Sequence, residues 1–187
     1  MFQLFRMRGW LLALWLVNAG TVLVFLSFAG ALPLIKSEWQ LSNSQAGVIQ
    51  AAPQAGYIIA VLVLSSVTDY IPARRLIPAC ALWAGVANLG FALLASDMTS
   101  AIVWRALTGL GVAGIYMPGV RLISERVTAE RRGGLVGMFV SAFTLGSAAS
   151  IALGGSLSTA LGWRTAFAML SAGPIIGALI FWRAIPG

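Results

Sequence analysis

The sequence predicts an all-α integral membrane protein with six transmembrane helices, and three observations support that prediction. Of the 187 residues, 59% are hydrophobic and only 9% are charged, whereas a soluble domain carries about 25% charged residues. The apolar residues gather into six stretches, each long enough to cross a bilayer as a helix of about 20 residues. No stretch has the sustained alternation of apolar and polar residues that a membrane β-barrel requires.

The six stretches are expected to form one bundle that covers residues 1–187. Ser42 and Gln45 match a capping box, which predicts the start of the second helix. Arg105, in the fourth stretch, is the single charged residue within a predicted span. The predicted spans are residues 10–34, 45–68, 76–95, 99–120, 134–156 and 165–182.

The arginines and lysines alternate between the two ends of the predicted bundle. Lys36 and Arg164 lie on one side. The other side carries nine of the twelve basic residues: Arg6, Arg8, Arg74, Arg75, Arg121, Arg126, Arg131, Arg132 and Arg183. Because basic loops stay in the cytoplasm, we expect a multi-pass protein of the cell membrane with both termini cytoplasmic.

A secretory signal peptide is the alternative interpretation of the first apolar stretch. Arg6 and Arg8 precede the stretch, and Ala29-Gly30-Ala31 resembles a small-residue cleavage site. The apolar run is about 25 residues, which is longer than a typical signal-peptide core. We therefore expect the stretch to remain as a membrane-spanning helix.

Composition argues against several classes of function. One cysteine and no histidine argue against a disulfide framework and a metal or haem site, so no cofactor is expected. The net charge of +7 is explained by orientation in the membrane, and no basic face with interleaved aromatics suggests nucleic-acid binding. No nucleophile–base pair is visible, so an enzyme is not expected.

Asp69 is predicted at the cytoplasmic end of the second helix, where the helix dipole disfavours a carboxylate. It should therefore have a cationic partner, although an ordinary loop charge is the simpler alternative. The segment reads Ser65-Ser66-Val67-Thr68-Asp69-Tyr70-Ile71-Pro72-Ala73-Arg74-Arg75. It resembles the inner loop of the major facilitator superfamily, Gly-x-x-x-Asp-Arg-x-Gly-Arg-Arg/Lys, at the aspartate and the two distal arginines. The resemblance implies a gate latch formed by Asp69, Arg74 and Arg75.

Arg105 lies about six residues, or about 9 Å, into the fourth span. A charge at that depth costs on the order of 2.5 kcal/mol or more, so it should face the bundle interior or snorkel to the interface. Arg105-Ala-Leu-Thr-Gly109-Leu-Gly111-Val-Ala113-Gly114 resembles the helix-four pattern of the same family. In that family the arginine is linked to substrate or proton handling, which favours the interior position.

The spacing Gly109-x-Gly111-x-x-Gly114 also matches a dinucleotide-binding pattern. We reject that interpretation because no strand precedes it and it lies inside an apolar helix. These small residues are expected to allow close helix packing.

Three further segments extend the resemblance, in the family's order, over residues ~10–183. Helix five shares four glycines with the antiporter pattern, but Ser150 and Ile151 replace its Gly-Pro, which argues against drug/proton antiport. Glu125 lies in a segment similar to the family's inner loop between helices four and five, and is expected to pair with arginines there. Gly162-Trp163-Arg164 is similar to the outer turn into helix six.

The resemblance implies the N-terminal half of such a transporter, built as two inverted three-helix repeats. Helices one and four line the cavity in this family, which makes Asn18, Thr21, Arg105 and Tyr116 the candidate substrate-binding residues. The expected function is transport of a small polar or anionic solute by alternating access. One bundle cannot alternate alone, so the partner would be a separate chain, a missing C-terminal half or a second copy. The alternative is a non-transporting membrane subunit that serves in assembly or docking of a larger complex.

Overall fold

The computed structural model of the chain describes residues 2–67 and 70–185. It confirms an all-helical fold with six helices that are long and apolar enough to cross a membrane, and it contains no strand within those residues. The first five spans are α1 (Phe2–Glu38), α2 (Asn43–Val67), α3 (Ala73–Leu94), α4 (Met98–Arg126) and α5 (Ala129–Leu161). The sixth is divided into α6 (Trp163–Leu170) and α7 (Ala172–Ala184).

The division of the sixth span lies at Ser171, three residues before Pro174. Pro33, Pro53, Pro78 and Pro118 lie inside helices that continue, so a proline alone does not break a helix here. The predicted span of residues 165–182 includes this division, and the whole segment Trp163–Ala184 is long and apolar enough to cross a membrane.

The helix ends also correct the expected loop between the fourth and fifth spans. Arg121 and Glu125, expected in a cytoplasmic loop, lie on the last turns of α4. Their side chains form an ion pair of 2.7 Å at the i, i+4 spacing that stabilises helices. The connection itself is short, because α5 already begins at Ala129.

The start of α2 follows the prediction. The backbone N–H of Ser42 donates to Gln45 Oε1 at 2.8 Å, and the backbone N–H of Gln45 donates to Ser42 Oγ at 3.2 Å. This reciprocal pair is the expected capping box. A second capping box, between Asp97 and Ser100, begins α4.

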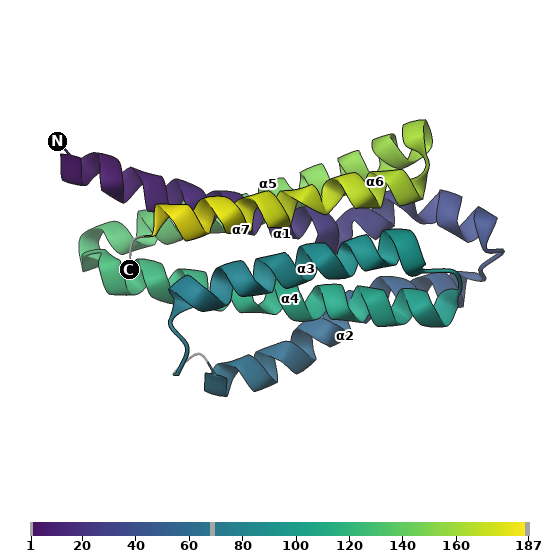
Figure 1. Cartoon of the computed structure of the whole chain (residues 1–187), viewed down its shortest axis with the longest axis horizontal. Helices are drawn as coiled ribbons and strands as arrows, with labels where there is room; N and C mark the ends of the chain where they lie inside the picture. The colour runs from purple at the N-terminus through teal and green to yellow at the C-terminus, as the bar shows by residue number, and fades with distance from the viewer. Residues whose placement is uncertain (1, 68–69, 186–187) are drawn as a thin grey trace.

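The packing of the helices repeats within the chain. α1 packs mainly on α5 and α7, while α4 packs mainly on α2 and α3. The first three spans correspond to the last three: α1 to α4, α2 to α5, and α3 to the sixth span. Under this exchange, the contacts of α1 with α5 and α7 become the contacts of α4 with α2 and α3. Successive spans run in opposite directions (Figure 1), so the exchanged helices are antiparallel, as in the predicted inverted repeats.

Glycines bring the exchanged helix pairs into close contact. A Cβ on Gly109 of α4 would collide with the backbone of Pro53 in α2. In the matching pair, a Cβ on Gly154 of α5 would collide with the backbone of Ser27 in α1. Gly109 therefore serves helix packing, as predicted.

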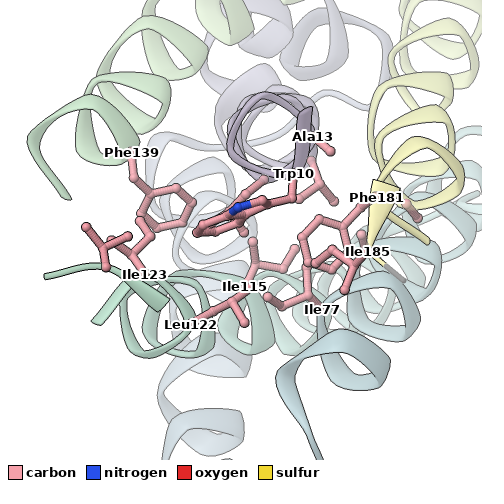
Figure 2. Close-up of a cluster of buried hydrophobic side chains, with 14 residues drawn as sticks. Trp10, Ala13, Ile77, Ile115, Leu122, Ile123, Phe139, Phe181 and Ile185 are labelled. Carbon is pink, nitrogen blue, oxygen red and sulfur yellow. The ribbon is translucent and has the colours of Figure 1, made fainter. Parts of the chain in front are cut away.

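One end of the bundle carries α3's first turn, the α4–α5 connection and the end of α7 (Figure 1); we call it the arginine-rich end. A buried hydrophobic cluster from α1, α3, α4, α5 and α7 fills the interior there. Trp10 reaches from α1 toward Ile115, with Phe139 on one side and Phe181 on the other (Figure 2). The cluster packs α1, α3, α4, α5 and α7 against one another at this end.

Two helices are much less covered than the rest. In their most apolar stretches, 28% of α2 and 22% of α5 are buried inside the bundle, against 44% to 61% for the other spans. α2 and α5 also occupy equivalent positions in the two repeats, since α2 packs on α4 as α5 packs on α1. Their outer faces are the surfaces left for lipid or for another helical bundle.

Candidate functional site

A cavity of about 440 Å³ lies between α1, α2, α4 and α5. It therefore lies against the two least covered helices, and it is of the size that binds small organic ligands. Nine residues line it: Asn18, Phe25, Gln54, Tyr57, Ile58, Val112, Tyr116, Val140 and Phe143.

Aromatic rings form much of the cavity wall. Phe25 and Tyr57 approach with ring centroids 6.2 Å apart, which links α1 to α2. Tyr116 lies 6.3 Å from Phe143 in an edge-on arrangement, which links α4 to α5. The two repeats thus contribute one aromatic pair each.

Two amide side chains supply polar atoms to the cavity, and both use their nitrogen elsewhere. Asn18 Nδ2 donates to the carbonyl of Phe139 at 3.2 Å. The amide of Gln54 is satisfied when its nitrogen donates to the carbonyls of Gln50, at 2.6 Å, and Ala51, at 3.2 Å. The hydroxyls of Tyr57 and Tyr116, which can donate or accept a hydrogen bond, are the other polar groups of the lining.

The cavity contains two of the four predicted substrate-binding residues, Asn18 and Tyr116. Thr21 is buried at 1% exposure and its hydroxyl donates to the carbonyl of Val17, one turn earlier, at 2.6 Å. Arg105 does not line the cavity either. The binding roles of all four remain predictions.

Arg105 is fully buried, which excludes the snorkelling alternative. Its guanidinium donates to the carbonyls of Val24, at 2.9 Å, and Phe25, at 2.7 Å, in α1. The rings of Phe28, Phe91 and Phe167 surround it, at 5.7 to 5.9 Å from its central carbon. Carbonyl dipoles and ring faces stabilise the charge in place of a carboxylate.

Asn88, in α3, is a buried polar residue that was not among the predicted site residues. Its Oδ1 accepts from Arg105 at 3.5 Å, and its Nδ2 donates to the Phe167 carbonyl at 3.0 Å and to Ser171 Oγ at 2.9 Å. The amide therefore connects Arg105 to the break between α6 and α7. An asparagine inside an otherwise apolar span was the available signal, since intramembrane polar residues mark sites by default.

A second hollow, of about 360 Å³, lies at the arginine-rich end between the start of α3 and the end of α4. Of the four predicted gating residues, Arg74 and Glu125 line it. Arg75 is exposed and lies outside its wall. Asp69 falls outside the described residues.

The opposite end of the bundle is held by the predicted turn into the sixth span. Trp163 Nε1 donates to Glu38 Oε2 at 2.6 Å, which joins α6 to the end of α1. The Arg164 guanidinium donates to the carbonyls of Ala92, at 3.1 Å, and Ala95, at 2.8 Å, at the end of α3. Among the described residues, no three His, Cys, Asp or Glu side chains are placed to hold a metal ion.

Comparison with known proteins agrees with this architecture. The sequence model of the Major Facilitator Superfamily matches residues 14–187. The chain is 34% identical over 178 residues to the uncharacterized transporter YgaY of Escherichia coli O157:H7, covering 91% of this chain and 44% of that protein. It is 27% identical to the 4-hydroxybenzoate transporter PcaK of Acinetobacter baylyi, covering 82% and 34% respectively.

The fold is shared with a solved transporter structure. A bacterial homolog of the human lysosomal transporter Spinster, inward-facing and unoccupied, superposes with a TM-score of 0.87 at 19% identity, covering 97% of this chain and 43% of that one. The chain spans less than half the length of the relatives that it matches. It is a membrane transporter homologue and not an enzyme, and it belongs to the major facilitator superfamily.

Proposed function

We propose that this chain is one six-helix bundle of a secondary active transporter, which moves a small polar solute by alternating access against a second bundle. The observation that carries the proposal is the cavity between α1, α2, α4 and α5. It combines aromatic walls with a few polar atoms, as solute sites do. Its position against the least covered helices suits a site shared between two bundles.

The aromatic wall favours a solute that contains a ring. A relative named for 4-hydroxybenzoate transport supports this choice. The sequence also favoured an anion held by Arg105. That version has less support, because the guanidinium is fully buried and directed at backbone carbonyls of α1.

The test is uptake by the complete assembly, purified from its own membrane and reconstituted in vesicles under an ion gradient. We expect uptake of a labelled small aromatic solute, and a loss of at least about tenfold in Tyr116→Ala. Leu93→Ala, which changes an exposed side chain of α3 outside both the cavity and the second hollow, should transport normally. Absence of uptake for a panel of polar and aromatic solutes under every ion gradient would contradict the proposal.

We also propose a latch at the arginine-rich end, formed by Asp69, Arg74, Arg75 and Glu125. The hollow lined by Arg74 and Glu125 supports it. Glu125→Gln should change the rate of uptake without changing solute affinity, because a latch acts on the conformational step. An equal loss of affinity would contradict a latch.

The proposed orientation places both termini in the cytoplasm. After Cys80 is replaced by Ala, a cysteine at Gln40 should react with a membrane-impermeant maleimide from outside intact cells. A cysteine at Tyr70 should react only after the membrane is opened. The reverse pattern would invert the topology.

The second candidate function is a non-transporting subunit that docks other membrane proteins. The large uncovered faces of α2 and α5 favour it. Native mass spectrometry of the gently extracted protein separates the two candidates. A second six-span bundle supports transport, whereas an assembly of unrelated subunits supports docking.

A further inference from the structure

We propose that a groove on α1, between α5 and α7, binds an acyl chain of an anionic phospholipid whose headgroup lies at the arginine-rich end. The groove has a volume of about 390 Å³, and its lining includes Leu16, Gly20, Leu145, Leu153, Ile176 and Ile180. It is separate from the solute cavity, so this inference goes beyond the proposed function.

The groove exists because α1 is covered by two helices that do not meet. α1, α5 and α7 lie together along one side of the bundle (Figure 1). In the described part of the chain, α5 and α7 each pack on α1 but not on each other. The strip of α1 between them is therefore the floor of the groove, and α5 and α7 are its walls.

The surface of the groove suits hydrocarbon. Leu16, Gly20 and Leu23 belong to its floor, and none of its lining side chains is charged. Leu145 on one wall is 59% exposed and Ile176 on the other is 54% exposed. A chain in the groove contacts protein on three sides, so it gains more van der Waals contacts than it would on the convex surface of a single helix.

The groove lies on the side of α1 that faces away from the solute cavity. Asn18 and Phe25 line the cavity, whereas Leu16 and Leu23, each two residues earlier, line the groove. A helix turns by about 100° per residue, so the two pairs of side chains point about 160° apart. A second bundle that completes the cavity therefore meets the other side of α1, and the groove is left to the membrane.

The groove leads toward the arginine-rich end. Ile180 lines it one turn before α7 ends at Ala184. On α1 its lining extends from Trp15 to Leu23, a rise of about 12 Å. The arginines at the start of α3, the end of α4 and the end of α7 lie at the same end of the bundle, and clustered basic residues at a membrane surface attract anionic headgroups. A phosphate at this end and a chain in the groove belong to one phospholipid.

The experiment maps the contacts of a phospholipid probe with the complete assembly, purified from its own membrane and reconstituted in vesicles. The probe is phosphatidylglycerol with a diazirine in the middle of one acyl chain, and mass spectrometry locates the labelled residues after irradiation. We expect Leu145 to be labelled at least about fivefold more than Val86 of α3, because a chain held on three sides stays longer. The two side chains are equally accessible, at 59% and 57% exposure. Equal labelling would overturn the inference, and so would an unlabelled groove, which would mean that protein covers it.

Ala149→Phe tests the groove itself, because it adds a ring to the α5 wall. Labelling of Leu16 and Ile176 should fall, whereas Ala79→Phe, at an exposed position of α3, should leave it unchanged. Unchanged labelling in a folded Ala149→Phe variant would overturn the inference. If that variant does not fold, the comparison of Leu145 with Val86 in the unsubstituted protein decides.

Phosphatidylcholine with the same chain and the same diazirine tests the charge of the headgroup. At equal mole fraction it should label the groove less than phosphatidylglycerol does, because the arginine-rich end attracts the anionic lipid. Equal labelling by the two probes would overturn the assignment of an anionic lipid.

Discussion

Arg105 joins three helices through its guanidinium and through Asn88. Arg105→Ala removes these bonds and leaves a void among three phenylalanine rings, so we expect it to lower the free energy of unfolding by about 3 kcal/mol. The thermal unfolding midpoint in detergent measures this loss. Arg183→Ala, an exposed arginine at the end of α7, is the control. An unchanged midpoint in Arg105→Ala would show that the bundle does not depend on the buried charge.

Asp97 gives a prediction about pH, because it caps α4 outside the membrane span. The backbone N–H of Ser100 donates to Asp97 Oδ1 at 2.8 Å and the Ser100 hydroxyl donates at 3.0 Å, and these bonds hold the pKa of the carboxyl below its usual value. A lowered pKa in the folded state means that the carboxylate stabilises the fold above the ordinary carboxyl pKa, about 3.9. That stability is lost as pH falls through the folded-state value.

Asp97→Ala removes the cap, so it should lower the unfolding midpoint at neutral pH. The difference from the unsubstituted protein should shrink as the pH falls through the folded-state pKa. Midpoints measured between pH 7 and the lowest pH at which the protein stays folded test this. A difference that stays constant with pH would mean that the negative charge of Asp97 does not stabilise the cap.

Single residues were harder to place from the sequence than helices. For Arg105, the depth of the charge left two positions, the bundle interior and the interface, and the family resemblance favoured the interior. Thr21 was a candidate substrate-binding residue, but a hydroxyl within a helix bonds its own backbone as readily as it faces a cavity, and its hydroxyl donates to the carbonyl of Val17. The sequence also did not indicate that the carbonyls of Val24 and Phe25 would accept hydrogen bonds from the guanidinium. Every residue has a backbone carbonyl, so the residue type does not show which carbonyl acts as the acceptor.

At the scale of elements, glycine spacing makes a prediction about helix pairs. Gly109→Val should separate α2 from α4, because any Cβ at that position collides with the backbone of Pro53. We expect a loss of at least about 2 kcal/mol in the free energy of unfolding, as overpacking typically produces. Thermal unfolding in detergent is the measurement.

The matched control is Gly133→Ala in α5, where an added Cβ meets nothing within 4 Å. Alanine has the higher helix propensity, by about 1 kcal/mol, so this variant should be as stable as the unsubstituted protein or more so. Equal tolerance at Gly109 and Gly133 would show that close α2–α4 packing is not required.

The helices themselves were predictable because each contains a mostly apolar stretch of sufficient length. The ends of the helices were not predictable from hydropathy, because a helix can continue past its apolar stretch. In α4, the last turns carry the ion pair between Arg121 and Glu125. Pro174 did not predict the break in the sixth span, because Pro33, Pro53, Pro78 and Pro118 lie inside helices that continue.

At the scale of the whole molecule, the uncovered part of α5 points to what completes the bundle. An added Cβ at Gly133, Gly134 or Gly137 meets nothing within 4 Å, whereas Gly146 and Gly154 of the same helix pack on α1. Small residues on a membrane helix allow another helix to approach closely. We therefore expect Gly133, Gly134 and Gly137 to contact the second bundle.

Gly137→Leu should therefore leave this bundle folded and weaken its association. The leucine adds bulk where the described part of the chain has no neighbour, so the unfolding midpoint of this chain should not fall. The fraction of the chain found in complex by native mass spectrometry should fall, with an association constant reduced at least about tenfold, or about 1.4 kcal/mol. Ala79→Leu, at an exposed position of α3, controls for added bulk at the lipid-facing surface. If both variants assemble like the unsubstituted protein, the glycines of α5 face lipid and the second bundle must meet this one through α2.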